Sequence, residues 1–217
     1  MPEQSLTRVV CLHAQDDLRI ENRPLERPGP GQVMVAIQAG GICGSDLHYW
    51  LEGGIGTIRV REPIILGHEA SGRIEALGEG VTGLTRGQLV ALNPSQPCGT
   101  CSFCQHGLPR HCIAMRFKGS AMYLPHQQGM FRDRIVIEAD QCFAVPDEID
   151  PGAAACSEPL AVCLHAANRG EAIAGSLSGK VVLVTGAGPI GALCVAVAKR
   201  RGASEIIVTD IQDATLA

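Results

Sequence analysis

The sequence predicts a β-rich domain followed by an α/β unit, and three observations carry this prediction. Up to about residue 145 the chain alternates short β-prone runs with turns rich in glycine and proline, which is typical of a small, partly open barrel. From Asp150 the residues become alanine-rich with helical spacing. The pattern over residues 180–209 then indicates strand, glycine-rich turn, helix and strand, which is one βαβ unit. We therefore predict two domains, residues 1–156 and 157–217.

The first domain is divided by turns into short predicted strands. Residues 28–31, 53–54 and 78–80 are the glycine- and proline-rich interruptions. The predicted strands are residues 8–13, 18–22, 32–39, 74–77, 88–92 and 134–137. A helix is predicted to begin near Glu158 with Pro159 at its first position, because the first N–H groups of a helix have no partner within it.

Composition excludes several classes of partner. The chain has 18 Lys+Arg against 22 Asp+Glu, a net charge of −4, so it lacks the basic footprint of a nucleic-acid-binding protein. The N-terminus shows no basic segment followed by an apolar one, as a secretory signal would. Val181–Ala198 has no charge, but glycine and proline interrupt it as they would not in a membrane helix. We expect a soluble, cytoplasmic protein with neither a nucleic-acid nor a membrane partner.

The βαβ unit contains a turn of the G-x-G-x-x-G type between its first strand and its helix. In that context the three glycines allow a tight turn, close approach to a pyrophosphate, and packing of the helix on the strand. The residues predicted to bind a dinucleotide are Gly186, Gly188, Pro189, Ile190, Gly191 and Asp210. Asp210 ends the next strand, where it suits the ribose hydroxyls, and no arginine follows it for a 2′-phosphate. NAD is therefore favoured and NADP stays open; the alternative is a turn that binds nothing.

Four of the ten cysteines form a cluster, Cys98, Cys101, Cys104 and Cys112. In a protein without a secretory signal such a cluster indicates metal binding rather than disulfides. Four thiolates at these spacings satisfy tetrahedral zinc, whereas an iron–sulfur cluster prefers a different final spacing. We predict a closed, structural zinc site that fixes a lobe at about residues 94–116. His106 and His111 are predicted to be ordinary loop residues.

Other possible metal ligands are dispersed along the chain. They are Cys43, His68, Glu69 and Glu158. Spacing does not show that these residues meet, and each is as readily explained as a buried residue that binds nothing. A zinc hydrolase is not indicated, because no second histidine follows His68 and Glu69 at the step that H-E-x-x-H requires.

Five motifs in order resemble those of the zinc-dependent medium-chain dehydrogenases. The motifs are GICGSDLHYW, LGHE, the four-cysteine lobe, SEPL and GAGPIG. The polyol branch of that family is similar through CGSDLHYW and SEPL, and NPSQPCGTC with MRFKGSAMYLPH resembles members that oxidise L-idonate, a sugar acid. The resemblance implies a GroES-like, partly open β-barrel catalytic domain followed by the first βαβ unit of a Rossmann dinucleotide-binding domain.

The resemblance also assigns a catalytic zinc to the dispersed residues. Cys43 and His68 would be ligands, and Glu69 or Glu158 would be the third. A thiolate, an imidazole and one carboxylate make the site neutral, whereas a second carboxylate would make it negative and raise the pKa of its water. We therefore expect Glu69 and Glu158 to exchange roles rather than to bind together, with Asp46 in support.

Further residues receive roles near that zinc by the same resemblance. Ser45 would take the proton of the alcohol and His48 would be the far end of a relay through the cofactor ribose, although Ser45 could also cap a helix over residues 46–51. Tyr49 and Phe117 would form walls of the substrate pocket. The carboxylate of a sugar acid needs a cation, for which the hypothesis is Arg116. Lys118 and His126 are the weaker candidates.

The implied reaction is oxidation of a secondary alcohol, with zinc as Lewis acid and NAD or NADP as hydride acceptor. L-idonate to 5-ketogluconate is the first candidate. Alternatives are a sorbitol- or xylitol-type polyol dehydrogenase and a non-enzymatic, zinc-stabilised binding module. The small-molecule substrate would be the partner, and the full-length form would be a homo-oligomer, a dimer or tetramer. Family members continue well beyond one βαβ unit, so the chain resembles a truncated member expected to bind NAD poorly and to be weakly active or inactive alone.

Overall fold

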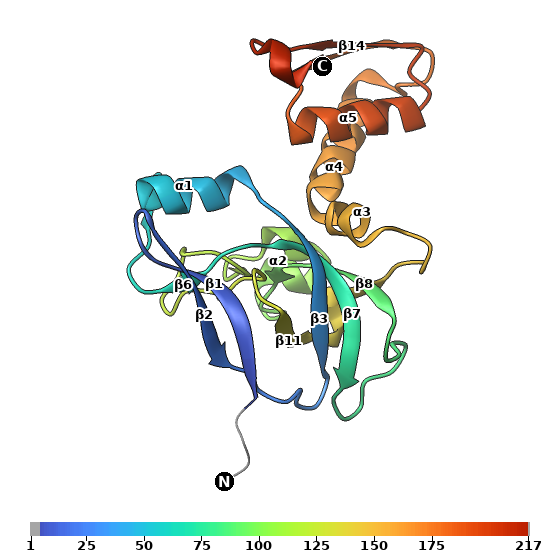
Figure 1. Cartoon of the computed structure of the whole chain (residues 1–217). Coiled ribbons are helices and arrows are strands. Elements are labelled where there is room, and N and C mark those ends of the chain that lie inside the picture. Colours follow the sequence, from blue (N-terminus) through green and yellow to red (C-terminus); the bar gives the residue numbers. More distant parts are fainter. Residues whose placement is uncertain (1–4, 217) are drawn as a thin grey trace. The chain divides into compact units, whose positions relative to one another are not determined.

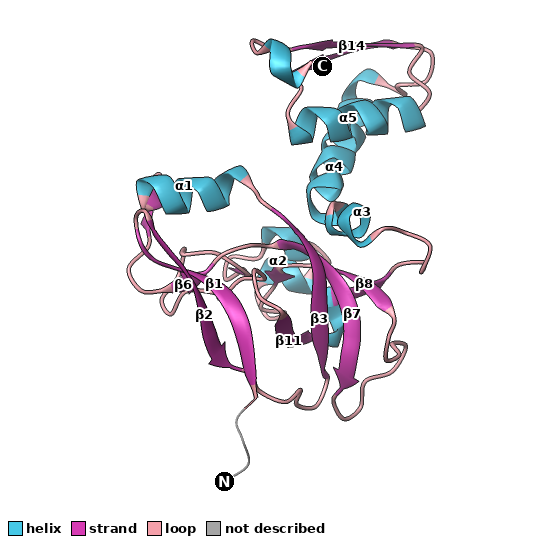
Figure 2. Cartoon of the chain, viewed as in Figure 1, coloured by secondary structure: helices cyan, strands magenta, loops and turns pink. Residues whose placement is uncertain are grey.

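The structure is a computed structural model that describes residues 5–216. It divides into two compact units, the first ending at Cys156 and the second beginning at Ser157 (Figure 1). Strands make up most of the regular structure of the first unit, while the second contains two long helices and a pair of strands (Figure 2). The predicted combination of a partly open β-barrel with the start of an α/β domain is thus confirmed.

The first unit is built from antiparallel strands in two main sheets. The strands are β1 (Leu6–Ala14), β2 (Asp17–Pro24), β3 (Gln32–Gly41), β4 (Gly54–Ile55), β5 (Ile58–Arg59), β6 (Ile64–Ile65), β7 (Glu69–Leu77), β8 (Leu89–Leu92), β9 (Ser95–Gln96), β10 (Arg116–Phe117), β11 (Arg134–Glu138) and β12 (Cys142–Ala144). One sheet has the order β11-β3-β7-β8-β12 and the other β2-β1-β6, and Figure 1 shows β3, β7 and β8 side by side. The pairs β4–β5 and β9–β10 are separate short ribbons.

All six predicted strands are present; five lie within two residues of the predicted bounds, whereas β7 begins at Glu69, five residues before the predicted start. The strands that the sequence did not predict are two or three residues long. Such short segments have too few residues to show an alternating pattern, so they form strands only because they pair with distant partners. One example is β6, which exists because Ile64 and Ile65 pair with Leu12 and Cys11 of β1.

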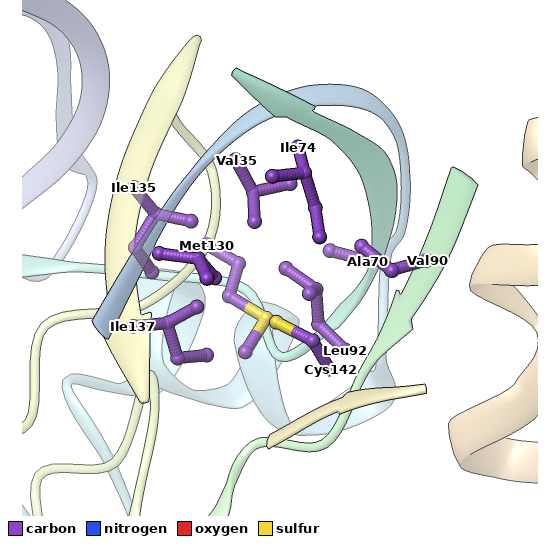
Figure 3. Close-up of a cluster of buried hydrophobic side chains, with 10 residues drawn as sticks. Val35, Ala70, Ile74, Val90, Leu92, Met130, Ile135, Ile137 and Cys142 are labelled. Atoms are coloured by element: carbon purple, nitrogen blue, oxygen red, sulfur yellow. The ribbon is translucent and has the colours of Figure 1, made fainter. Parts of the chain in front are cut away.

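The five-stranded sheet curls around an apolar core. The core cluster consists of Val33, Val35, Ala70, Ile74, Val90, Leu92, Met130, Ile135, Ile137 and Cys142, and its labelled members point toward one another in Figure 3. In β3 and β11 the buried residues alternate with more exposed ones, as expected when one face of a strand packs and the other does not. The core thus fixes the register of the strands whose ends carry the candidate site.

The two sheets meet along one side rather than closing into a complete barrel. The Val10 N–H donates to the carbonyl of Phe131 at 2.8 Å, and Val9 forms an isolated antiparallel bridge with Arg132. Close by, the hydroxyl of Thr7 accepts the N–H of Arg134 at 3.0 Å. These contacts seal one edge of β1, and the result agrees with the predicted partly open barrel.

The described part of the first unit, residues 5–156, contains the α-helices α1 (Gly44–Glu52), α2 (Ser102–Gln105) and α3 (Pro151–Ala155). Two 3₁₀ turns span Pro109–His111 and Ala139–Gln141. The prediction that Ser45 could cap α1 is wrong, because the helix begins at Gly44 and its N-cap is Cys43. Asp46 lies three residues after that cap and accepts its N–H, which leaves Ser45 inside the first turn.

The second unit contains the predicted βαβ arrangement. Helix α4 (Ser157–Ala174) precedes β13 (Val181–Thr185), α5 (Pro189–Arg200) and β14 (Glu205–Thr209), and a 3₁₀ turn (Asp213–Thr215) follows. Strands β13 and β14 are parallel and paired from Val181–Glu205 to Thr185–Thr209. Pro159 is the third helical residue rather than the first, still within the turn whose N–H groups lack helical partners. Over residues 5–216, no helix is long and apolar enough to cross a membrane.

Candidate functional site

Pairing of β3 with β7 brings Cys43 and His68 to the same place. The strands are antiparallel, and the last residue of β3, Gly41, is paired with the first residue of β7, Glu69. Cys43 follows β3 by two residues and His68 immediately precedes β7, so both leave the sheet at one edge. The donor atoms of Cys43, His68 and Glu69 all lie within 4.8 Å of one another. His68 is buried, and the other two are half-buried.

Asp46 ties the two segments of this group together. Its Oδ2 accepts the Cys43 N–H and its Oδ1 accepts the Gly67 N–H, both at 3.0 Å. The same Oδ1 lies 3.8 Å from Nδ1 of His68. Asp46 is only 2% exposed, and its carboxylate connects both loops. Because the site is buried, removing these hydrogen bonds would leave donors unsatisfied and lower the free energy of unfolding. With Nδ1 on the side of this carboxylate, Nε2 of His68 is the nitrogen that would be available to a metal.

Two glycines beside the group leave space that a side chain would fill, and the sequence analysis missed both. A Cβ on Gly41 would overlap Oε2 of Glu69, the residue paired with it across the sheet. Gly67 has φ +88°, and a Cβ there would overlap the ring of Phe131. The double glycine before Ile42 was the signal in the sequence, but only the strand register shows what it accommodates.

The donor set fits zinc. A thiol, an imidazole and a carboxylate are the side chains that zinc binds, and three protein ligands leave a fourth position open, as in catalytic rather than structural sites. The family resemblance placed these three residues in one hypothesis, and the structure brings them together. Glu158 lies in the first turn of α4, in the second unit, and its exchange with Glu69 stays a prediction.

Phe117 and Arg116 lie on β10 near this group. The Phe117 ring centroid is 5.3 Å from that of His68, so Phe117 covers one side of the imidazole. The Arg116 guanidinium stacks over the Tyr123 ring, 4.3 Å from its centroid. Its Nη1 is buried and has no hydrogen-bond partner among residues 5–216. Arg116 therefore keeps donor capacity that an anion could use.

The other predicted site residues have different surroundings. Tyr49 is 4% exposed, packs in a core cluster with Leu12 and Ile64, and its hydroxyl accepts the Ala121 N–H at 3.2 Å. His48 is on the exposed side of α1, where its Nδ1 lies 2.8 Å from Oε1 of Glu52.

Of the two weaker candidates for a carboxylate-binding cation, His126 uses both ring nitrogens within the fold. Nε2 accepts the Arg61 N–H at 3.0 Å and Nδ1 lies 2.8 Å from the Tyr123 carbonyl. Burial lowers the pKa of Lys118, with the nearby charge of Arg132 acting in the same direction. Neither side chain therefore matches the unsatisfied donor of Arg116.

The four cysteines of the lobe also converge. All four sulfur atoms lie within 4.8 Å of one another, and those of Cys101 and Cys104 are 3.5 Å apart. The Cys98 sulfur accepts the Thr100 hydroxyl at 3.6 Å and the Cys101 N–H at 3.3 Å, and such hydrogen bonds lower the pKa of Cys98 to about 6. The Cys112 sulfur accepts the Cys98 N–H at 3.2 Å. Thiolates stabilised by backbone donors suit a closed, four-sulfur zinc site.

The glycine-rich turn has the geometry that the sequence predicted. A Cβ on Gly191 would overlap the Gly186 carbonyl, whereas Gly188 has open space around it. Asp210 reaches back to the turn, since its Oδ2 accepts the Ala187 N–H at 2.7 Å and its Oδ1 accepts the Gln212 N–H at 2.9 Å. These donors hold the pKa of Asp210 below its usual value, so the carboxylate is ionised at neutral pH.

A cavity of about 620 Å³ lies elsewhere in the first unit, between β1, β2, β3 and α1. Its lining is mostly apolar and includes Asp46, Leu66 and Phe131. Cys43, His68 and Glu69 are not among the residues that line it. The cavity thus borders the back of the site at Asp46 but does not open onto the metal-binding donors.

These features are those of the zinc-dependent medium-chain dehydrogenase family, and comparison with known proteins agrees. The alcohol dehydrogenase GroES-like domain matches residues 29–147, more than half of the chain. The chain belongs to the zinc-dependent medium-chain alcohol and polyol dehydrogenase family.

Individual relatives are sugar-acid and polyol enzymes by name. The L-idonate 5-dehydrogenase (NAD(P)(+)) of Escherichia coli K12 is 44% identical over 184 residues, covering 85% of this chain and 52% of that protein. The sorbitol dehydrogenase of Gallus gallus is 40% identical over 207 residues, covering 95% and 56%. The crystal structure of the Escherichia coli L-idonate 5-dehydrogenase matches with a TM-score of 0.89 at 39% identity, covering 99% of this chain and 60% of that one. The chain thus spans about half the length of the curated relatives it matches.

Proposed function

We propose that this chain carries the zinc-binding part of a dehydrogenase that oxidises a secondary alcohol of a sugar acid or polyol with NAD(P)⁺. L-idonate to 5-ketogluconate is the first candidate reaction. The convergence of Cys43, His68 and Glu69 within 4.8 Å at one sheet edge is the observation that supports this most strongly. Relatives named for L-idonate and sorbitol support the substrate class.

Zinc at this group supplies Lewis acidity that lowers the pKa of a substrate hydroxyl, and the nicotinamide supplies the hydride acceptor. Cys43, His68 and one carboxylate would hold the ion, while Asp46 keeps their loops in place. Since two carboxylates would make the site negative, we propose that Glu69 and Glu158 alternate as the third ligand.

Proton transfer would run along α1. Ser45 and His48 are three residues apart, so they lie on the same side of the helix. We propose that the Ser45 hydroxyl accepts the proton of the alcohol and that His48, whose side chain is 54% exposed, delivers it to solvent. Phe117 would restrict water beside His68, and the half-buried guanidinium of Arg116 would bind the carboxylate of a sugar acid.

The glycine-rich turn would receive the pyrophosphate of the cofactor at the start of α5. The ionised carboxylate of Asp210, oriented by the N–H groups of Ala187 and Gln212, would accept a ribose hydroxyl. We propose that these 217 residues bind the cofactor weakly by themselves. One face of the β13–β14 pair leaves Val181 59%, Leu183 61% and Ile207 44% exposed, and a parallel sheet is stable when both faces are covered.

The test is NAD(P)H formation with L-idonate, sorbitol, xylitol and a simple secondary alcohol, with zinc content measured alongside. It compares these 217 residues with a polypeptide extended to the length of the relatives. We expect turnover of L-idonate by the extended protein and little by the shorter one. A preference for sorbitol would show that the substrate is a polyol rather than a sugar acid. If the extended protein has full zinc occupancy and turns over none of these substrates, the enzyme hypothesis is rejected in favour of a zinc-stabilised binding module.

Arg116 is tested separately with Arg116→Ala in the extended protein. We expect the KM for L-idonate to rise while that for sorbitol, which has no carboxylate, stays the same. Unchanged KM values for both substrates would refute the assignment of Arg116.

A further inference from the structure

A third group of metal-binding side chains lies on the β1–β2 hairpin. The donor atoms of Cys11, His13 and Glu21 all lie within 4.8 Å of one another. Cys11 and His13 are two residues apart on β1, where a bulge between Leu12 and Ala14 interrupts the pairing with β2, and Glu21 is on the adjacent strand, paired with Val9. Neither the proposed dehydrogenase chemistry nor the cysteine lobe uses these residues.

The carboxylate of Glu21 contacts Arg23 and His13 through different oxygens, and it also accepts a hydrogen bond from the Cys11 thiol. Arg23 contacts only Oε1, from Nε at 2.9 Å and from Nη2 at 2.6 Å. The other oxygen, Oε2, lies 3.3 Å from Nε2 of His13. Arg23 therefore holds the carboxylate through Oε1 and leaves Oε2 facing the imidazole. A residue that hydrogen-bonds a metal ligand in this way orients the ligand toward the metal.

The spacing suits a small divalent ion. Zinc bonds of about 2.0–2.3 Å place tetrahedral ligand atoms roughly 3.3–3.8 Å apart. The His13–Glu21 pair already has this separation. The sulfur of Cys11, which is 1% exposed, is the floor of the group, while the side chains of His13 and Glu21 are 23% and 28% exposed. An ion can therefore enter from solvent and keep a water at its fourth position.

We propose that Cys11, His13 and Glu21 form a separate zinc-binding site on the β1–β2 hairpin. The Cys11 thiol would release its proton to solvent on binding, so that thiolate, imidazole and carboxylate hold the ion. Arg23 approaches the Cys11 sulfur to 3.7 Å, and Arg132 is a further positive charge near it. Burial and the hydrogen bond with Glu21 nevertheless raise the pKa of Cys11 above its usual value, and the arginine charges repel a cation, so this site binds zinc more weakly than the four-cysteine lobe.

The experiment counts zinc per chain by equilibrium dialysis and native mass spectrometry at micromolar free zinc. We expect the wild-type chain to bind one zinc more than the two sites described above account for, and that ion to leave first on dilution. His13→Ala should remove it. Cys11→Ser should also remove this ion, but Cys11 is buried and its substitution can disturb folding. The decisive variants are therefore at His13 and Glu21, which are partly exposed.

Glu75→Gln is the matched control for Glu21→Gln. Both carboxylates lie on a strand and pair with an arginine, Glu75 with Arg134 at 2.6 Å, so both variants lose the same charge and the same kind of ion pair. The extra zinc should be lost from Glu21→Gln and retained in Glu75→Gln. The proposal is overturned if the wild-type chain binds no extra zinc, or if His13→Ala retains it. Zinc loss from Cys43→Ser reports on the dehydrogenase site alone, so the two proposals fail separately.

Discussion

Gly41→Ala tests whether Glu69 is a metal ligand, because the structure gives that substitution one main effect. A Cβ at position 41 would occupy the place of Oε2 of Glu69, which is the flexible end of a side chain rather than backbone. The carboxylate can turn away, at a cost of about 1 kcal/mol for an unfavourable rotamer. We therefore expect a small change in the free energy of unfolding of the zinc-free protein.

Zinc affinity should respond more strongly than stability. If Glu69 binds the ion or orients its ligands, displacing the carboxylate should weaken zinc binding about 10- to 100-fold, which is roughly 1.4–2.8 kcal/mol. The assay is cobalt substitution with competition by a chelator, since the spectrum of a one-thiolate site differs from that of the four-thiolate lobe. Glu69→Gln should show a similar loss, and the double variant should lose little more, because both changes remove the same ligand.

Gly44→Ala is the matched control. Gly44 adjoins Cys43, and a Cβ there has nothing within 4 Å, so metal affinity should stay at the wild-type value. The reasoning is refuted if Gly41→Ala binds metal like wild type while Glu69→Gln does not. If neither variant weakens binding and Glu158→Gln does, the third ligand is Glu158.

Three further predictions concern stability. Asp46→Ala should lower the free energy of unfolding by about 2–4 kcal/mol in urea denaturation, because two N–H donors lose their acceptor, and Asp46→Asn, which keeps one oxygen, should lose less. Gly191→Ala should lower the free energy of unfolding by about 1–3 kcal/mol, because its Cβ meets the Gly186 carbonyl. Gly188→Ala should change the free energy of unfolding by no more than about 0.5 kcal/mol, and equal effects of the two substitutions would contradict the packing argument. Burial raises the pKa of Cys142 to about 12, whereas an unfolded thiol has a pKa of about 8.5. The contribution of the neutral thiol to the free energy of unfolding is therefore complete below about pH 8.5 and is lost as pH rises toward 12. Wild type should therefore lose up to about 1.4 kcal/mol per pH unit more than Cys142→Ala over that range, and parallel pH profiles would show that burial does not hold the thiol neutral.

The sequence alone determined the local chemistry of this protein. Alternating and β-branched runs predicted the long strands, because a strand with one buried face needs a two-residue period. The βαβ unit was predicted almost residue for residue, since its strand, glycine turn and helix are each specified by neighbouring residues. The cysteine lobe was predictable for the same reason, as its four sulfurs lie within 15 consecutive residues, Cys98–Cys112.

Only the tertiary structure decided which distant residues meet. Cys43 and His68 come together because β3 and β7 pair with Gly41 opposite Glu69, and the buried faces of both strands fix that register. No local pattern contains this information, so the sequence left the dispersed ligands as separate possibilities. The same holds for Gly41, whose missing side chain matters only through a partner 28 positions away in the sequence, and for the group of Cys11, His13 and Glu21 across a hairpin. Chemistry carried by one continuous segment was decided by that segment, whereas chemistry shared between segments was decided by the sheet that joins them.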